Sequence, residues 1–292
     1  MNPTVILTGA NAGIGLAASH ELARRGATVV MACRNEERGR RAVDQVREAT
    51  GHDAVHLIQV DMSSLTSVRA FAQTVRRRFD RVQAVIHNAA LFDISQREVE
   101  HTDDGLERVW ATNFVGPWLL TRLLRPLLQR AQPGRVIDIS SKGLMAYPFL
   151  RVDPVAAAKG ERYSPERAYY QSKLAGLMHS QHLARTADPQ SLVAHAVWVP
   201  AVKVALDRLP PMSACKRSIY LMKRRFALEP QQMAPVYADL ALEPAWEACT
   251  GTLVSHDLKR VRLPAAARDP DAGEALEAAM QAWLASRGED DL

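Results

Sequence analysis

Short apolar runs rich in β-branched residues recur along the chain and alternate with longer amphipathic stretches. Six runs predict strands: Thr4 to Thr8, Thr28 to Ala32, Val55 to Val60, Ala84 to His87, Arg135 to Ile139 and Val193 to Val199. Each of the first five precedes a stretch with helical periodicity. Continuous apolar strands with helices between them are typical of βαβ units and of a parallel sheet covered on both faces. The pattern therefore predicts an α/β fold with a doubly wound parallel sheet, the three-layer αβα arrangement of the Rossmann type.

One Rossmann-type dinucleotide-binding domain is expected over residues 1–292, because α/β folds of this length commonly close around one core. No repeat or low-complexity linker divides the chain. Two proline-containing segments, about 144–163 and 201–229, fit the alternation least well. In a doubly wound fold, irregular segments after the late strands lie over the ligand crevice. We therefore expect both segments to border the substrate site.

Composition and charge narrow the class of protein without changing the predicted fold. Apolar residues make up 47% of the chain and charged residues 24%, as in a soluble globular protein. The net charge of +5 comes from scattered groups such as Arg76 to Arg78, which favour a solvated surface over a nucleic-acid footprint. Cys33, Cys215 and Cys249 lie far apart without metal-ligand spacing, which predicts reduced thiols and no metal site. With no predicted signal peptide or integral membrane segment, we expect a cytoplasmic protein.

The first predicted strand leads directly into a glycine-rich turn that opens a helix, Thr8-Gly9-Ala10-Asn11-Ala12-Gly13-Ile14-Gly15. Gly9 permits the sharp turn, Gly13 lets the backbone approach a pyrophosphate, and Gly15 allows close packing. The helix N-terminus offers free N–H groups and a positive dipole end. Between a strand and a helix, this spacing predicts dinucleotide binding. The expected contacts are Thr8, Gly9, Asn11, Gly13, Ile14 and Gly15.

The end of the second predicted strand indicates which cofactor is bound. The sequence there is Ala32-Cys33-Arg34-Asn35, with Arg38 one helical turn later, where an NAD-binding chain would carry an acidic residue. A guanidinium forms a charge-assisted fork with the 2′-phosphate of NADP. The alternative for Arg34 is a solvated arginine at a strand end. We expect NADP(H), bound by Arg34 and Arg38.

Tyr169 and Lys173 lie four residues apart, which places both on one face of a predicted helix. A phenol titrates near pH 10 and is a poor base at neutrality. An ammonium about 4 Å away, at an effective dielectric of about 20, contributes roughly 4 kcal/mol, or about three pKa units. We therefore expect Lys173 to lower the pKa of Tyr169 toward working pH and the pair to act as an acid/base device. Tyr163 and Tyr170 lack such a partner lysine and are expected to be structural.

The glycine-rich turn, His87-Asn88-Ala89-Ala90, Asn113, Ser140-Ser141 and Tyr169-x-x-x-Lys173 together resemble the short-chain dehydrogenase/reductase family. Their order and spacing match over nearly the whole chain. Ala32 to Asn35, Thr112 to Gly116 and the wide gap between Ser141 and Tyr169 are most similar to the branch of retinol dehydrogenases and protochlorophyllide reductases.

This resemblance implies roles for the individual residues. Tyr169 is the proton donor or acceptor, and Lys173 lowers its pKa and holds the nicotinamide ribose. Ser141 orients the substrate oxygen, and Asn113 supports a water relay. Four further residues are implied to lie at the adenine or beside the cofactor: Asp61, Met62, Asn88 and Ala89. Relatives often pair through two long helices, which here would span about Leu106 to Arg130 and Pro165 to Arg185, so a homodimer or homotetramer is expected.

Two positions depart from the pattern of the family. Ala90 stands where a glycine is usual, so we expect it to adopt a backbone conformation normally given to glycine. The turn after the sixth strand, Pro200-Ala201-Val202-Lys203-Val204-Ala205, lacks the usual threonine. The cofactor is therefore expected to contact backbone groups at Pro200 and Val202, or Lys203.

The sequence thus predicts an NADP(H)-dependent oxidoreductase that interconverts a carbonyl and an alcohol on a hydrophobic small molecule, polycyclic ones included. Enone C=C reduction at the same Tyr169/Lys173 site, or a non-catalytic NADP-binding regulatory protein, are the alternatives. Apolar residues near the expected crevice fit either such a pocket or ordinary core packing: Phe92, Ile94, Leu144, Met145, Tyr147, Phe149, Leu150 and Leu206 to Met222. The basic residues Lys216, Arg217, Lys223, Arg224 and Arg225 fit a solvated helix face, or a lid for an anionic substrate or peripheral membrane contact.

Overall fold

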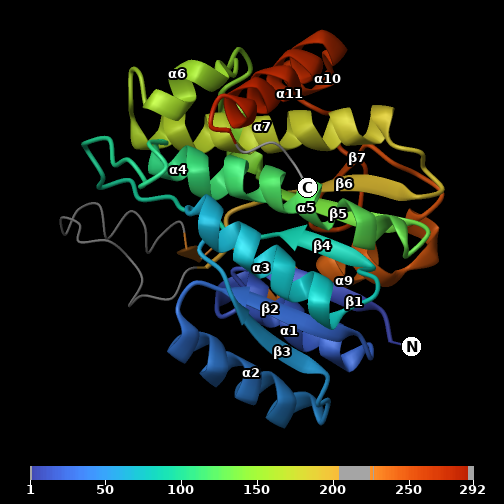
Figure 1. Ribbon diagram of the computed structural model, residues 1–292. Helices are drawn as coiled ribbons and strands as arrows, with labels where there is room; N and C mark the ends of the chain where they lie inside the picture. The colour runs from blue at the N-terminus through green and yellow to red at the C-terminus, as the bar shows by residue number, and fades with distance from the viewer. Residues whose placement is uncertain (1, 204–223, 226, 289–292) are drawn as a thin grey trace.

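A parallel sheet of seven strands forms the centre of the computed structural model, which describes residues 2–203, 224–225 and 227–288 (Figure 1). The strands are β1 (Thr4–Thr8), β2 (Thr28–Cys33), β3 (Val55–Gln59), β4 (Ala84–His87), β5 (Gly134–Ser141), β6 (Leu192–Val199) and β7 (Thr252–Val254). They are ordered β3-β2-β1-β4-β5-β6-β7, and every neighbouring pair is parallel. The prediction of a doubly wound sheet is confirmed.

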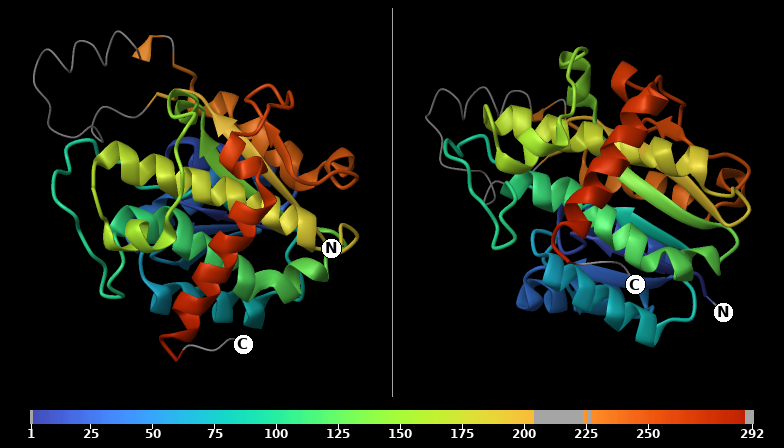
Figure 2. Two further views of the ribbon diagram at one scale, coloured as in Figure 1. Left: turned by 90° about the horizontal axis from the view of Figure 1, so that it is seen from above. Right: turned by 45° about the horizontal axis from the view of Figure 1, so that its top comes forward.

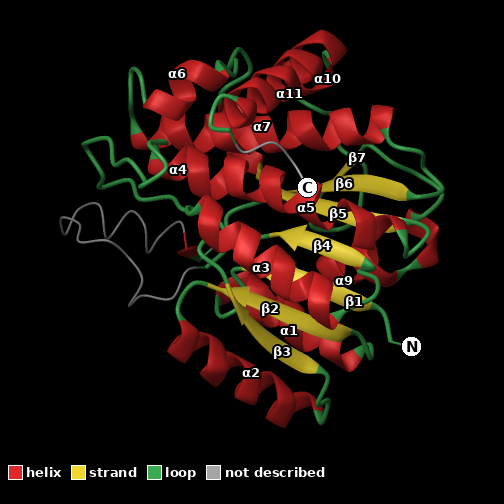
Figure 3. Cartoon of the chain, viewed as in Figure 1, coloured by secondary structure: helices red, strands yellow, loops and turns green. Residues whose placement is uncertain are grey.

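Helices cover both faces of the sheet, as Figure 3 shows with helices in red and strands in yellow. One layer contains α1 (Gly13–Arg24), α2 (Glu36–Thr50) and α9 (Ala234–Leu242). The opposite layer contains α3 (Leu65–Arg78), α5 (Gly116–Gln129) and α7 (Pro165–Thr186). Each layer buries its own apolar cluster against the sheet, as the continuous apolar strands require.

Shorter elements connect these layers. They are α4 (Arg108–Trp110), the π-helix η1 (Ala111–Val115), the 3₁₀ helices η2 (Lys142–Ala146), η4 (Pro230–Gln232) and η5 (Pro244–Trp246), and the α-helices α6 (Pro154–Lys159), α10 (Ala265–Arg268) and α11 (Pro270–Ala285).

The six predicted strands are all present, with ends that differ from the prediction by no more than two residues. The strand that the pattern missed, β7, has three residues and pairs with β6 at the edge of the sheet. A run this short carries too few positions for a period to be read. The predicted contribution of Leu206 to Met222 lies outside the described residues.

The carboxyl ends of the strands meet along one edge of the sheet because all the strands are parallel. The chain leaves β1 toward β2 and β3 and then returns to place β4 on the other side of β1. This reversal creates a crevice between β1 and β4 at the carboxyl edge, which is where doubly wound folds bind ligands. Thr8, Cys33, His87 and Ser141, the last residues of their strands, lie at this edge.

The C-terminal helices lie across the outer side of α7, as both views in Figure 2 show. Glu277 of α11 points inward and is 9% exposed. It accepts a hydrogen bond of 2.9 Å from the Trp118 indole of α5 and lies 3.4 Å from Arg122 and 3.4 Å from His179 of α7. A single buried carboxylate thus joins α11 to both α5 and α7.

This packing changes the prediction about self-association. The two long helices expected to pair between subunits, α5 and α7, are contacted in this chain by its own α11. Helix α11 therefore occupies part of the surface through which these helices were expected to pair. The homodimer or homotetramer stays a prediction.

Among the described residues, no helix combines the length and the apolar character needed to cross a bilayer.

Replacing Glu277 by alanine is expected to reduce the free energy of unfolding by about 3 kcal/mol, because the Trp118 N–H, His179 and Arg122 lose a buried partner. Burial alone raises the pKa of Glu277, but bonds from His179, Trp118 and Gln281 outweigh it and lower that pKa to about 2. Since the folded pKa lies below the ordinary 4.5, this stabilisation is complete above pH 4.5 and is lost as the pH falls toward 2. Urea denaturation at neutral and acidic pH measures both effects.

The matched control is Glu274→Ala, on the exposed side of the same helix, which is expected to change the free energy of unfolding by no more than about 0.5 kcal/mol. Equal stability of the two variants at neutral pH would contradict the anchoring role of Glu277.

Candidate active site

The glycine-rich turn is pressed against the end of β4. Gly9 has a φ of +65°, and a Cβ there would lie 2.9 Å from the Cα of Ala89. A Cβ on Gly15 would lie 2.4 Å from the Gly9 carbonyl oxygen, so only glycine fits. Gly13 has a φ of +56° with nothing within 4 Å of an added Cβ. The geometry therefore agrees with the predicted turn at Gly9 and close packing at Gly15, while the approach of a pyrophosphate to Gly13 stays a prediction.

The polar residues around this turn hold its shape. The Ala89 N–H donates to the Thr8 hydroxyl at 3.0 Å, and the Asn88 amide donates to the Thr8 carbonyl at 2.9 Å. The Tyr237 hydroxyl of α9 donates to the Asn88 amide oxygen at 3.2 Å. Thr8, Asn88 and Ala89, predicted as cofactor contacts, thus lie together at the β1–β4 crevice. Tyr237 was not predicted, because nothing in its local sequence shows that its hydroxyl reaches this turn.

The first turn of α1 is open to a ligand. Ala12 stands at the N-cap position and makes no side-chain capping bond. Asn11 and Ile14 flank Gly13 and are half-buried. Uncapped N–H groups at a helix N-terminus are suited to a phosphate, so the arrangement fits the predicted pyrophosphate site.

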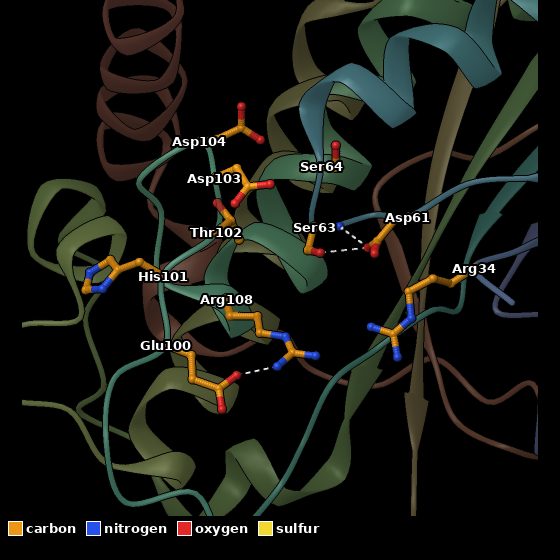
Figure 4. A pocket seen from close by; sticks show the side chains of 10 residues that line it. All are labelled: Arg34, Asp61, Ser63, Ser64, Glu100, His101, Thr102, Asp103, Asp104 and Arg108. Atoms are coloured by element: carbon orange, nitrogen blue, oxygen red, sulfur yellow. Dashed lines mark hydrogen bonds and ion pairs between the residues drawn. The ribbon is translucent and has the colours of Figure 1, made fainter.

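A cavity of about 530 Å³ lies beyond the end of β2 (Figure 4). Arg34 reaches into it from the strand end, and Arg108 extends from α4 on the opposite wall. Asp61 lines the same cavity and accepts two bonds from Ser63, at 2.9 Å and 2.7 Å. The remaining lining residues are Ser63, Ser64, Glu100, His101, Thr102, Asp103 and Asp104.

The two arginines of this cavity differ in their partners. Arg108 forms an ion pair with Glu100, whereas the Arg34 guanidinium forms none with any described residue. The sequence did not single out Arg108, because its distance from Arg34 along the chain gives no sign that they share a cavity. Met62 is buried and Arg38 is exposed on α2, and neither belongs to the lining residues.

Helix α7 carries Tyr169 and Lys173 into the site. It begins at Ser164, whose hydroxyl accepts the Arg167 N–H at 3.1 Å, with Pro165 in the first turn. The Lys173 ammonium is buried and donates to the Ile139 carbonyl of β5 at 2.8 Å. It lies 5.8 Å from the centre of the Tyr169 ring. Ser141, at the end of β5, interacts with the Tyr169 hydroxyl and accepts the Gly143 N–H at 3.2 Å. The structure therefore brings Ser141, Tyr169 and Lys173 together.

The electrostatics of Tyr169 differ from the prediction. Packing around its hydroxyl raises the pKa of Tyr169 to about 12, against an opposing effect of the bond to Ser141. Lys173 does not offset this effect, because its ammonium is turned to the Ile139 carbonyl. The predicted lowering of the Tyr169 pKa is therefore wrong for this structure. A phenol with this pKa is protonated at neutral pH and is suited to donate a proton.

Asn113 lies in the π-helix η1, a rare conformation that is frequent at functional sites. Its amide oxygen accepts the Leu91 N–H at 2.7 Å, and its amide group donates to the Leu91 carbonyl at 3.0 Å. It also donates to the Ser172 hydroxyl of α7 at 3.1 Å. Asn113 thus fastens the segment after β4 to the helix that carries Tyr169. Its predicted part in a water relay stays a prediction.

Aromatic side chains form a wall beside Tyr169. The Phe92 ring stacks on Tyr169 with the ring centres 4.3 Å apart. Tyr170 contacts Tyr169 edge-on at 5.1 Å and Tyr147 at 4.5 Å. Three further predicted residues are exposed: Ile94, Met145 and Phe149. Leu144 is buried, and Leu150 packs against the core. The predicted apolar surface is thus present at Phe92 and Tyr147, and Leu144 is ordinary core.

The structure describes Ala90 and the start of the turn after Pro200, the two positions that depart from the family pattern. Ala90 does not adopt a positive φ, so the expectation of a glycine-like backbone there is wrong and the alanine is unstrained. After Pro200, Val202 forms a parallel bridge with Leu228. Lys203 forms an ion pair with Glu229, so its ammonium already has a partner. Val204 and Ala205 lie outside the described residues.

Comparison with known protein families gives one family match. The profile described as short chain dehydrogenase matches residues 3–208. Retinol dehydrogenase 14 of Mus musculus is 30% identical over 259 residues, which cover 85% of this chain and 76% of the relative. Retinol dehydrogenase 11 of Homo sapiens is 32% identical over 248 residues, or 85% and 75% of the two chains. Dehydrogenase/reductase SDR family member 13 of Bos taurus is 37% identical over 198 residues, 66% of this chain, and the chain spans about half of its length.

Solved structures share the fold. An uncharacterized protein from Mycobacterium Paratuberculosis, 28% identical, superposes with a TM-score of 0.67 and covers 96% of this chain and 92% of its own. A short chain dehydrogenase from Shigella flexneri 2a str. 301, solved in complex with NADP, is 23% identical with a TM-score of 0.67 and covers 88% and 98%.

A series of glycine substitutions is expected to separate close packing from backbone strain. Gly15→Ala forces a methyl group onto the Gly9 carbonyl and is expected to lower the free energy of unfolding by about 2 kcal/mol or more. Gly13→Ala meets no atoms but keeps a positive φ, and is expected to cost about 1 kcal/mol. Gly176→Ala, in the middle of α7 with open space around it, is expected to stabilise by about 0.5 to 1 kcal/mol. Chemical denaturation of the three variants measures this order, and a Gly15→Ala protein as stable as wild type would contradict it.

Proposed function

The chain belongs to the short-chain dehydrogenase family of oxidoreductases, and from the geometry of its site we propose that it uses NADP(H) to reduce a carbonyl group on a hydrophobic small molecule to an alcohol. The observation that carries the proposal is the meeting of Ser141, Tyr169 and Lys173 at the carboxyl edge of the sheet, beside the crevice between β1 and β4.

The residues present fit a dinucleotide. The glycine turn leaves Gly13 open, and the first turn of α1 is uncapped. Arg34 extends into the cavity and forms no ion pair with a described residue. Gly9 to Gly15 would hold the pyrophosphate, Arg34 and Asp61 the adenosine end, and Lys173 the nicotinamide ribose. Among proteins of this fold, the Shigella flexneri relative was solved with NADP and one from Escherichia coli CFT073 with NADPH. We prefer the phosphorylated cofactor because Arg34, rather than an acidic residue, follows β2.

The chain supplies the proton and the cofactor supplies the hydride. A nicotinamide held by these residues would supply a hydride to the carbonyl carbon, and negative charge would then develop on the carbonyl oxygen. Tyr169 is protonated at neutral pH because packing around its hydroxyl raises its pKa, and it donates its proton to that oxygen. The Ser141 hydroxyl, next to Tyr169, donates a hydrogen bond to the same oxygen and orients it.

The substrate class follows from the wall beside Tyr169. Phe92, Tyr147 and Tyr170 offer flat apolar surfaces in contact with or close to the reacting phenol. Such surfaces favour an extended or ring-containing apolar carbonyl compound over a small polar one. Relatives of this chain are named retinol dehydrogenases, which agrees with a bulky apolar substrate.

Tyr169→Phe tests the proton donor. Loss of the hydroxyl is expected to lower kcat by about 10² to 10⁴-fold with hydrophobic ketones, because the developing alkoxide has no acid. NADPH binding, followed by fluorescence, is expected to stay within about twofold of wild type. Tyr163→Phe, just before the start of α7 and outside the site, serves as the control and is expected to turn over normally. Full activity of Tyr169→Phe would contradict the mechanism. A product that keeps its carbonyl group would show C=C reduction in place of carbonyl reduction.

Arg34→Gln tests the choice of cofactor. Removing the guanidinium is expected to weaken NADPH binding by about 10-fold or more, because a charge-assisted bond to the 2′-phosphate contributes about 1.5 to 3 kcal/mol. NADH lacks that phosphate, so its affinity is expected to change little. Arg40→Gln, at an exposed position of α2 paired with Glu36, is the matched control. Equal losses for both nucleotides in Arg34→Gln would argue that Arg34 does not bind the phosphate.

A further inference from the structure

A buried carboxyl group, Asp138, lies on the strand that leads to the active site. Side chains of a strand alternate between its two faces. Ile137 and Ile139 of β5 pack into the apolar cluster with α1 and α9, which turns Asp138 to the opposite face, toward α5 and α7. Asp138 is 7% exposed, and its Oδ2 atom has no hydrogen-bond partner among the described residues. The burial of Oδ2 is therefore not offset by a hydrogen bond from a described residue.

Lys173 lies on the same side of β5. Its ammonium is 6% exposed and donates to the carbonyl of Ile139, the residue next to Asp138. An ammonium has three donors and a full charge, so one carbonyl alone does not compensate for its burial. Burial lowers the pKa of Lys173 to about 8, and the Asp138 carboxylate acts against that lowering. Burial raises the pKa of Asp138 to about 6, while His179 and Lys173 act to lower it. Near pH 7 both groups are therefore charged, and each is the other's counter-charge.

The other titratable groups packed around this pair do not replace Asp138. His87 of β4 is its neighbour in the sheet, but burial lowers the pKa of His87 to about 3, and its neutral ring bonds to Thr121 of α5 at 2.7 Å. His179 of α7 faces Glu277 of α11. On the β6 side, the residue paired with Asp138 is Ala196.

Glu277 and Glu107 are the other buried glutamates among the described residues. Glu277 is engaged by Trp118 and His179, and Glu107 accepts the N–H groups of Val109 and Trp110. Tyr169, one turn before Lys173, is protonated. Asp138 is therefore the described carboxylate whose charge is left for Lys173.

We propose that Asp138 is a positioning residue of the active site: its buried carboxylate keeps the Lys173 ammonium charged, while His179 connects that carboxylate to Glu277 and α11. The inference rests on the proposed function in one respect, that the charged Lys173 holds the nicotinamide ribose beside Tyr169. The electrostatic link between Asp138 and Lys173 is a property of the fold and is testable without turnover.

Asp138→Asn keeps the size of the side chain and removes its charge. Without the carboxylate, the ammonium is less stable relative to the neutral amine, so Lys173 loses its proton at lower pH. In carbon-13 NMR of lysine-labelled protein, the titration midpoint of Lys173 is expected to fall by about one pH unit. The signal is identified by its absence in Lys173→Arg. Asp138→Glu, which keeps the charge, is expected to hold the midpoint near that of wild type.

The same shift is expected in the pH profile of catalysis. With saturating NADPH and a hydrophobic ketone, the alkaline limb of kcat/KM is expected to move about one pH unit toward acid in Asp138→Asn. The activity loss is therefore about tenfold above the midpoint and small near pH 6. A residue that only supports packing would lower activity equally at every pH. Ser180→Ala, which removes a buried uncharged hydroxyl from α7, is the control and is expected to leave the profile in place.

The outcomes separate the inference from the proposed function. An unchanged Lys173 midpoint in Asp138→Asn overturns the inference and leaves the proposed function standing. A shifted midpoint in a protein that reduces no carbonyl supports the electrostatic link and counts against the proposed function. If Asp138→Asn does not fold, His179→Gln takes its place. Removing His179 raises the pKa of Asp138, so the acidic limb, where Asp138 gains a proton, is expected to move to higher pH, and an unmoved limb overturns the inference.

Discussion

The bond from the Lys173 ammonium to the Ile139 carbonyl ties α7 to β5 at the carboxyl edge of the sheet. Through it, the helix that carries Tyr169 is held over the strand that ends at Ser141. A buried charge in this position constrains its surroundings, because a nearby counter-charge and precise packing are needed to keep it ionised. Asp138, on the same strand, supplies the counter-charge. The contacts of Asn113 with Leu91 and Ser172 contribute to the packing by fastening α7 to the segment after β4.

A second buried charge, that of Glu277, lies on the outer side of the same helical layer. Glu277 brings α11 onto α5 and α7, so the long helices are packed on both sides within one chain. His179 is 5% exposed, faces Glu277 and acts to lower the pKa of Asp138. Glu277, His179, Asp138 and Lys173 are therefore linked electrostatically, and a change at one of these positions alters the electrostatic environment of the others.

Local patterns in the sequence predicted the strands, the glycine turn and the spacing of Tyr169 and Lys173, because each depends on residues close together in the chain. Other properties depend on contacts between distant segments. The pKa of Tyr169 is set by the packing around its hydroxyl and by where Lys173 points, and neither is visible in a spacing of four residues. Arg108 and Tyr237 reach the crevice from segments whose local sequence is unremarkable. Ala90 differs in another way: the family pattern suggested strain, but the actual backbone has none.

The residues beyond the family match complete the sheet as well as the helical layers. Strand β7 pairs with β6, which is eight residues long and mostly buried. A fragment that ended at residue 208, where the match ends, would leave β6 as a long apolar edge with unpaired backbone groups, the kind of edge that promotes aggregation. It would also lack Tyr237, which bonds to Asn88 at the nucleotide turn. In this chain, the end of the family match is therefore not a boundary at which a stable folding unit can end.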